Sequence, residues 1–274
     1  LAGKQALWRF IQKWWIDPVC LPSLNAARAQ QQMAPVTHFF DHMLKAANAS
    51  VALFPDWFAA EQPDWPQPFW AGRFPNSHSE ISSPAELSTE LDRFLSEGDA
   101  PILITLGTGH QHAKDHFSTA LKVLKRMGRR GLFVSQHAAQ VPQNLPPTVM
   151  WQAYAPFGAL LPRMAAIVHH GGIGTMAEAF RAGVPQLIVP FAFDQFDNAL
   201  RAQRLGVGEI LMAKRFSTSR LTRRLETLLF SARVGEACAA LATRMQQNNG
   251  SPYVLNQIES ALGLQSTAAH AAPL

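Results

Sequence analysis

The sequence is poor in cysteine and in long apolar runs, and each shortage excludes a class of protein. Only two cysteines, Cys20 and Cys238, occur among 274 residues. They stand too far apart for a metal-binding spacing or a disulfide framework. This usage fits a reducing compartment, so we expect a cytoplasmic location. No apolar run reaches the roughly 18 residues that a membrane-spanning helix needs.

Charge is also scarce, at 16% of residues, with a formal net charge of +5. The basic residues are spread along the chain, which argues against a nucleic-acid partner. Hydrophobic residues make up 47%, enough for a buried core. One basic run is expected to be a solvated helix face, with contact to the inner face of an anionic membrane as the alternative. It comprises Lys214, Arg215, Arg220, Arg223 and Arg224.

Glycine is nearly absent from residues 1–98, which hold three of the seventeen glycines but six of the seven tryptophans. A stripe around Leu7, Ile11 and Trp14 recurs at helical spacing and is expected to be core rather than a membrane or ligand surface. The prolines of Gln62–Pro68 exclude a helix there. Residues 63–97 are therefore expected to be mostly linker, with a short helix near Pro84–Leu95.

Beyond Pro101, short apolar strands alternate with amphipathic helices. This alternation is typical of a parallel sheet covered on both faces. The predicted fold class is α/β, a Rossmann-like, doubly wound parallel sheet.

The segment VHHGGIGTMAEAF, residues 168–180, joins a strand to a helix at the carboxyl end of that sheet. Glycines without a Cβ, Gly172 and Gly174 among them, let a ligand approach the backbone closely. Free amides at the helix start attract an anion, most simply a phosphate. Thr175 can add a hydroxyl and His170 a ring N–H. His169 is expected to pack under the loop and bond its backbone.

The same letters also fit a dinucleotide fingerprint, G-x-G-x-x-A from Gly172 to Ala177, with Asp194 twenty residues beyond Gly174. Such a fingerprint normally follows the first strand of its domain, whereas about four predicted strands precede this one. An NAD(P)-binding oxidoreductase therefore remains the weaker alternative.

Five short motifs follow one another over some forty-five residues: Tyr154-Ala-Pro, His-His-Gly-Gly-Ile-Gly-Thr, Ala-Glu-Ala, Gly-Val-Pro and Asp194-Gln-Phe-Asp-Asn-Ala. This series resembles the donor-binding signature of GT-B nucleotide-sugar glycosyltransferases. It is most similar to the bacterial UDP-glucuronosyl/UDP-glucosyltransferase-like family, which includes the rhamnosyltransferase of rhamnolipid assembly. The resemblance implies an acceptor-domain remnant over residues 1–70, a linker over 71–98, a donor-binding domain over 99–250 and a C-terminal helix and tail over 251–274.

The resemblance also implies roles for individual residues. Tyr154 would stack on the nucleobase, the backbone of Ala155 would bind the base edge, and Glu178 would accept the ribose hydroxyls. The diphosphate would be held by His170, Gly172, Gly174 and Thr175, with Gly107, Thr108 and Gly109 reaching it from a second turn. Asp194 and Gln195 would bind the sugar, and Asn198 either completes this motif or lies on a helix surface. An alternative for Glu178 is a first-turn acid that compensates the helix dipole.

The resemblance implies transfer of a hexose from a UDP- or dTDP-linked donor, with inversion. The acceptor is an unidentified hydroxyl compound: a lipid, a glycolipid or a small molecule. His170 and the amides would stabilise the leaving phosphate, so neither a metal nor a cofactor is expected. His110, His112 and His116 are expected to be solvated rather than metal ligands, with the role of His110 left open because it follows a turn at the expected cleft. No segment of this sequence matches the one that carries the family's catalytic base. The chain is therefore expected to be the donor half of a longer protein and to be inactive alone. A nucleotide-sugar-binding module or subunit without activity of its own is the alternative.

Overall fold

The computed structural model describes residues 2–47, 49–75, 86–106, 114–247 and 258–259. The chain divides into two units, residues 1–73 with 251–274 and residues 74–250. The four-part division expected from the sequence stays a prediction, and its C-terminal helix and tail fall almost wholly outside the described residues.

The first unit contains helices and a small strand pair. Its helices are α1 (Ala2–Ile11), a π-helix (Gln12–Ile16), α2 (Asp17–Gln30) and α3 (Phe39–Lys45). Strands β1 (Ser50–Ala52) and β2 (Phe69–Ala71) pair in parallel. The tryptophan stripe is not core in this unit, because Trp14 is 60% and Trp15 71% exposed. Asp17 is buried and anchors α2, accepting from the Phe39 amide at 2.9 Å and lying 3.0 Å from His38 Nδ1.

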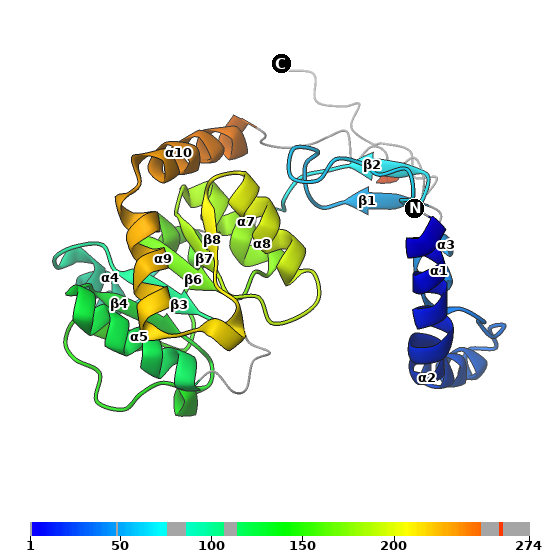
Figure 1. Ribbon diagram of the computed structural model, residues 1–274, viewed down its shortest axis with the longest axis horizontal. Coiled ribbons are helices and arrows are strands. Elements are labelled where there is room, and N and C mark those ends of the chain that lie inside the picture. The colour runs from blue at the N-terminus through cyan, green and yellow to red at the C-terminus, as the bar shows by residue number, and fades with distance from the viewer. Residues whose placement is uncertain (1, 48, 76–85, 107–113, 248–257, 260–274) are drawn as a thin grey trace, which may run out of the picture. The chain divides into compact units, whose positions relative to one another are not determined.

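The second unit is built on a six-stranded, wholly parallel sheet in the order β5-β4-β3-β6-β7-β8 (Figure 1). The strands are β3 (Ile102–Thr105), β4 (Gly131–Val134), β5 (Val149–Gln152), β6 (Ala166–His169), β7 (Gln186–Ile188) and β8 (Gly208–Ile210). The predicted doubly wound α/β fold is confirmed.

Helices cover both faces of this sheet. They are α4 (Thr89–Ser96), α5 (Lys114–Met127), α6 (Phe157–Leu160), α7 (Ile173–Ala182), α8 (Gln195–Arg204), α9 (Thr218–Phe230) and α10 (Ala232–Gln247). Short 3-10 turns occur at Ala138–Gln140, Leu161–Arg163 and Ala213–Arg215. Because strand side chains alternate between faces, Ile102 and Ile104 pack with α5 and α9, whereas Leu103 packs with α4 and α7.

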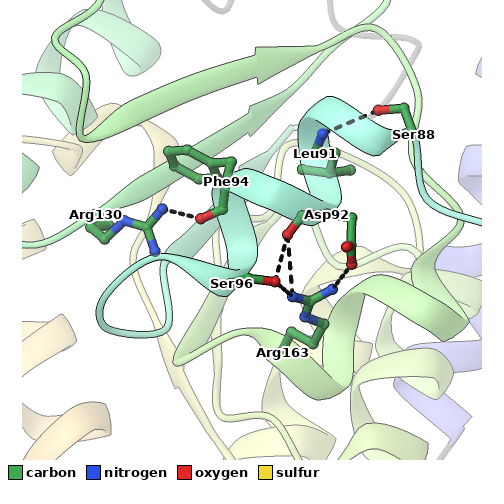
Figure 2. A network of polar contacts seen from close by, with 7 residues as sticks. All are labelled: Ser88, Leu91, Asp92, Phe94, Ser96, Arg130 and Arg163. Carbon is green, nitrogen blue, oxygen red and sulfur yellow. Dashed lines mark hydrogen bonds and ion pairs between the residues drawn. The ribbon is translucent and has the colours of Figure 1, made fainter.

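Helix α4 is held by two arginines that lie far from it in sequence (Figure 2). The guanidinium of Arg163 donates to Asp92 Oδ1 at 2.6 Å and to Ser96 Oγ at 3.0 Å. Arg130 donates to the Phe94 carbonyl and lies 4.1 Å from the centre of the Phe94 ring. At the helix start, Ser88 Oγ accepts the Leu91 amide at 3.3 Å. The short helix expected near Pro84–Leu95 is thus observed slightly later, at Thr89–Ser96.

The strand order creates a reversal point at the centre of the sheet. The chain runs outward from β3 to β5, returns to place β6 beside β3, and then runs outward the other way to β8. Thr105, at the end of β3, is aligned with His169, at the end of β6. Ligands of open α/β sheets bind at such a point, outside the carboxyl ends of the strands. The glycine-rich segment after His169 occupies this position.

Candidate functional site

Gly171 forms the buried half of the loop between β6 and α7. Its φ is +96°, a region that side chains rarely adopt. A Cβ there would lie 2.9 Å from Ile188 Cγ2 and 3.1 Å from the Gln195 carbonyl oxygen. Both of its backbone polar groups are used: its amide donates to His169 Nδ1 at 3.2 Å, and its carbonyl accepts from Asn198 Nδ2 at 3.0 Å. Only glycine fits this position.

His169 packs under the loop and bonds its backbone, as predicted. The side chain is completely buried. Since Nδ1 accepts the Gly171 amide, Nε2 carries the proton and donates to Gln186 Oε1 at 2.9 Å. Burial, with a smaller contribution from the neighbouring His170, lowers the pKa of His169 to about 3, although the hydrogen bond to Gln186 opposes the shift. His169 is therefore a neutral structural histidine.

The open half of the loop is the start of α7. Gly172 is its N-cap residue and has no side-chain cap, and the Met176 amide is the first to bond back, to the Gly172 carbonyl. Among the described residues the amides of Ile173, Gly174 and Thr175 have no acceptor. A Cβ on Gly174 would meet nothing within 4 Å. An uncapped helix start with open space in front of it is a site for an anion.

His170 lies against this helix start. A Cβ on Gly172 would come within 2.6 Å of His170 Nε2, so the ring occupies the space that a side chain at position 172 would fill. The structure therefore brings together His170, Gly172, Gly174 and Thr175, as the sequence analysis expected. Their binding of a diphosphate stays a prediction.

Asn198 links this loop to the start of α8. It is buried, and its Nδ2 donates both to the Gly171 carbonyl at 3.0 Å and to Asp194 Oδ2 at 2.8 Å. A helix-surface role for Asn198 is thus wrong. The Gln195 side chain turns back on its own loop, where Oε1 accepts the amides of Phe191 at 2.8 Å and Ala192 at 3.1 Å. Asp194 and Gln195 lie beside the glycine loop, and sugar binding by them stays a prediction.

Tyr154 and Ala155 follow β5 at the same edge of the sheet. The Tyr154 side chain is 72% exposed, and Ala155 is buried. Three strand spacings separate β5 from β6 in the sheet order, roughly 14 Å. A ligand that contacts both Tyr154 and the glycine loop must therefore be elongated.

Glu178 lies in the second turn of α7, so the first-turn alternative is wrong. It is buried, and Oε1 accepts from Arg181 Nη1 at 2.7 Å. Arg181 Nη2 also donates to the Pro75 carbonyl at 3.2 Å. The sequence analysis missed this pair, although the i,i+3 spacing on a helix is a signal for it. Recognition of ribose by Glu178 stays a prediction.

Several sequence-predicted residues lie outside the described part of the chain: Gly107, Thr108, Gly109, His110 and His112. His116 is described, and the expectation that it is solvated is wrong. It is half-buried, with ring centroids 4.8 Å from Phe216 and 5.6 Å from Phe191. Within the described residues no group of three histidines, cysteines or carboxylates could hold a metal ion.

The basic run is mostly exposed, as expected of a solvated face, except that Arg224 is half-buried and pairs with Glu209. None of the helices in the described ranges has the length and apolar character that crossing a membrane requires. The glycine sequence follows β6, the fourth strand of the sheet along the chain, whereas a dinucleotide fingerprint would follow the first, β3.

Comparison with known proteins agrees with this geometry. Residues 132–259 match the family described as "Erythromycin biosynthesis protein CIII-like, C-terminal domain". An O-mycaminosyltylonolide 6-deoxyallosyltransferase of Streptomyces fradiae is 36% identical over 162 residues, which cover 58% of this chain and 36% of the relative. A sterol 3-beta-glucosyltransferase of Candida albicans is 27% identical over 265 residues, covering 91% of this chain and 16% of the relative. The chain spans well under half the length of either relative.

Solved structures share the fold. A glycosyltransferase of kitacinnamycin superposes with a TM-score of 0.66 at 19% identity, covering 89% of this chain and 62% of the other. A UDP-glucose:anthocyanidin 3-O-glucosyltransferase in complex with UDP gives a TM-score of 0.67 at 16% identity, covering 80% and 54%. The parallel-sheet unit thus has the fold of a GT-B glycosyltransferase C-terminal domain. Within that class, residues 132–259 match the model of the CIII-like C-terminal domain, and the predicted resemblance to glycosyltransferases is confirmed.

Proposed function

We propose that this chain binds the nucleoside-diphosphate sugar in a glycosyltransferase that moves a hexose to an acceptor hydroxyl with inversion. The observation that carries the proposal is the uncapped start of α7 at the reversal point of the sheet, with the His170 ring beside it. The diphosphate lies on the amides of Ile173, Gly174 and Thr175. The nucleobase reaches Tyr154 and Ala155, and the ribose reaches Glu178.

The chemistry follows from the charge that develops at the leaving group. When the glycosyl bond breaks, negative charge builds on the outer phosphate. Amides and a histidine fixed at that position stabilise the transition state more than the ground state. The helix start and His170 take the part of a metal ion, so the proposal needs neither a metal nor a cofactor. The general base that activates the acceptor lies outside this corner.

The acceptor is proposed to be a large apolar alcohol. The names of the relatives point to a glycosylated tylonolide and to sterols as acceptors of those enzymes. UDP or dTDP is the proposed carrier, and UDP is present in one structure of the same fold. A nucleotide-sugar-binding module without activity of its own would use the same corner. Assays of sugar transfer by the chain from a nucleotide sugar to an apolar alcohol separate the two.

The decisive measurement is calorimetric titration of the chain with UDP, dTDP and NADH, repeated on His170→Ala. One pyrimidine diphosphate should bind saturably. The variant should bind it roughly tenfold to a hundredfold more weakly, because it loses a hydrogen bond to a charged group. His42→Ala is a control, since His42 belongs to the other unit. Binding of NADH alone, or equal affinity of wild type and His170→Ala, would overturn the proposal.

A further inference from the structure

The loop between β7 and α8 holds an aromatic residue in an unusual state. Phe193 has a φ of +56° and is 91% exposed. The other described non-glycine residues with positive φ are Gln32 and Asn144. Asparagine tolerates that region, but a bulky aromatic residue there is an outlier. Strain of this kind persists where function requires it.

The loop itself imposes this conformation. The Gln195 amide donates to the Ala192 carbonyl at 3.3 Å, so Phe193 is the first central residue of a tight turn. Turns with positive φ at that position strongly favour glycine. Gln195 Oε1 fixes the turn by accepting the amides of Phe191 and Ala192. A glycine would meet the backbone requirement of this turn without strain.

Phe193 does not contribute to core packing. Phe191, two residues earlier in the same loop, is half-buried and packs against the hydrophobic core and the His116 ring. Phe193 exposes almost its whole side chain. Core packing therefore explains the first phenylalanine and not the second.

The position of Phe193 indicates what the ring contacts. The next residue, Asp194, is joined through Asn198 to the Gly171 carbonyl, so this turn is tied to the phosphate loop by two hydrogen bonds. Under the proposed function, a diphosphate on the α7 amides carries its sugar on the outer phosphate, and the link through Asn198 puts the Phe193 turn beside the loop that holds this diphosphate. A pyranose ring has an apolar C–H face that packs on aromatic rings.

We infer that Phe193 is a stacking platform for the glycosyl group of the bound nucleotide sugar. The inference rests on the proposed function. The carboxylate of Asp194 then faces the hydroxyls, and the Phe193 ring covers the apolar face of the same sugar. Phe193 therefore strengthens binding of the nucleotide sugar but not of the bare nucleotide, and this role accounts for its strained backbone.

The test compares the affinities of the chain for UDP and UDP-glucose, and for dTDP and dTDP-glucose, by calorimetry. Phe193→Ala and Phe193→Gly should weaken binding of the nucleotide sugar by roughly tenfold and leave that of the nucleotide within about twofold. Phe193→Trp should keep the wild-type ratio. Because the side chain is exposed, the unfolding temperature should not fall, and Phe193→Gly should melt at or slightly above wild type.

Phe230→Ala is the matched control. Phe230 is 70% exposed, and its ring centre lies 5.7 Å from the guanidinium carbon of Arg129. Arg129 precedes β4, so it lies at the amino ends of the strands, whereas the glycine loop lies at their carboxyl ends. Phe230→Ala should leave both affinities unchanged. An equal loss of affinity for the nucleotide and the nucleotide sugar would mean that Phe193 only shapes the loop, and it would overturn the inference. Unchanged affinity for both ligands would overturn it as well. A wild-type chain that binds neither ligand would overturn the proposed function itself, and the inference with it.

Discussion

Gly171 and Gly174 stand three residues apart in one loop, and the structure uses them in opposite ways. Around Gly171 the neighbouring side chains of His169, Gln186 and Asn198 are buried and hydrogen-bonded within the protein, and no side chain fits at position 171. Around Gly174 the space is open, and Gly174 lies in the first turn of a helix whose start has no side-chain cap. One half of the corner holds the shape of the loop, and the other half is open where we propose that a ligand binds.

The same division separates the two adjacent histidines. His169 is neutral and fixed by the backbone, whereas His170 lies against Gly172 at the helix start. Substitutions can therefore act on the frame, meaning the buried surroundings of Gly171, or on the open face, meaning the helix start at Gly174. Damage to the frame should lower stability, and damage to the open face should lower only affinity.

Gly171→Ala should have the largest effect. The methyl group would clash with Ile188 and with the Gln195 carbonyl, and the backbone would be strained at φ +96°. Overpacking and strain together should lower the free energy of unfolding by roughly 3 kcal/mol. Urea denaturation measures this loss. A loss of less than about 1 kcal/mol would show that the frame yields easily, and the contrast between the two glycines would fail.

The pH dependence of stability tests the frame without changing its shape. Because the pKa of His169 is lowered to about 3 in the folded chain, its contribution is complete above the ordinary pKa of 6.5 and is lost as the pH falls toward 3. The unfolded chain binds the extra proton throughout this window. Stability should therefore fall by about 1.4 kcal/mol per pH unit from this group, well below its ordinary pKa.

Urea denaturation between about pH 6 and pH 5 measures that slope before most carboxylates titrate. His169→Gln should be less stable at neutral pH but show a flatter slope. The ring of His169 in the wild type should show no protonation by NMR in the same range. A His169 signal that titrates near its ordinary pKa would contradict the buried, neutral state.

The sequence predicted the strand–helix alternation and the glycine corner because both depend on local patterns. Apolar runs of strand length and a glycine-rich turn before helix formers can be seen within a dozen residues. The link from Asn198 to Gly171 could not be seen, since 27 residues separate them and only the packing of α8 beside the loop joins them. Gln186 looked like an ordinary strand residue, and its bond to His169 depends on the pairing of β6 with β7.

The prediction that the tryptophan stripe is core was wrong, because a local pattern was taken to indicate burial. Helical spacing identifies an apolar face but not what covers it. His116 shows the same limit, because the two rings that pack against it, Phe191 and Phe216, come from segments distant in sequence.

Gly174→Ala should have the smallest effect on the fold and should separate the two halves of the corner most clearly. The added methyl meets no protein atom within 4 Å, and alanine favours the helix, so stability should rise by about 0.5–1 kcal/mol. The methyl group would lie in the open space at the helix start, where we propose that the diphosphate binds, so UDP or dTDP should bind roughly tenfold more weakly. Gly235→Ala is the matched control: its Cβ is equally unobstructed in α10. It should gain similar stability and leave nucleotide binding unchanged. Unchanged binding in Gly174→Ala would mean that the open space is ordinary surface and that the ligand lies elsewhere.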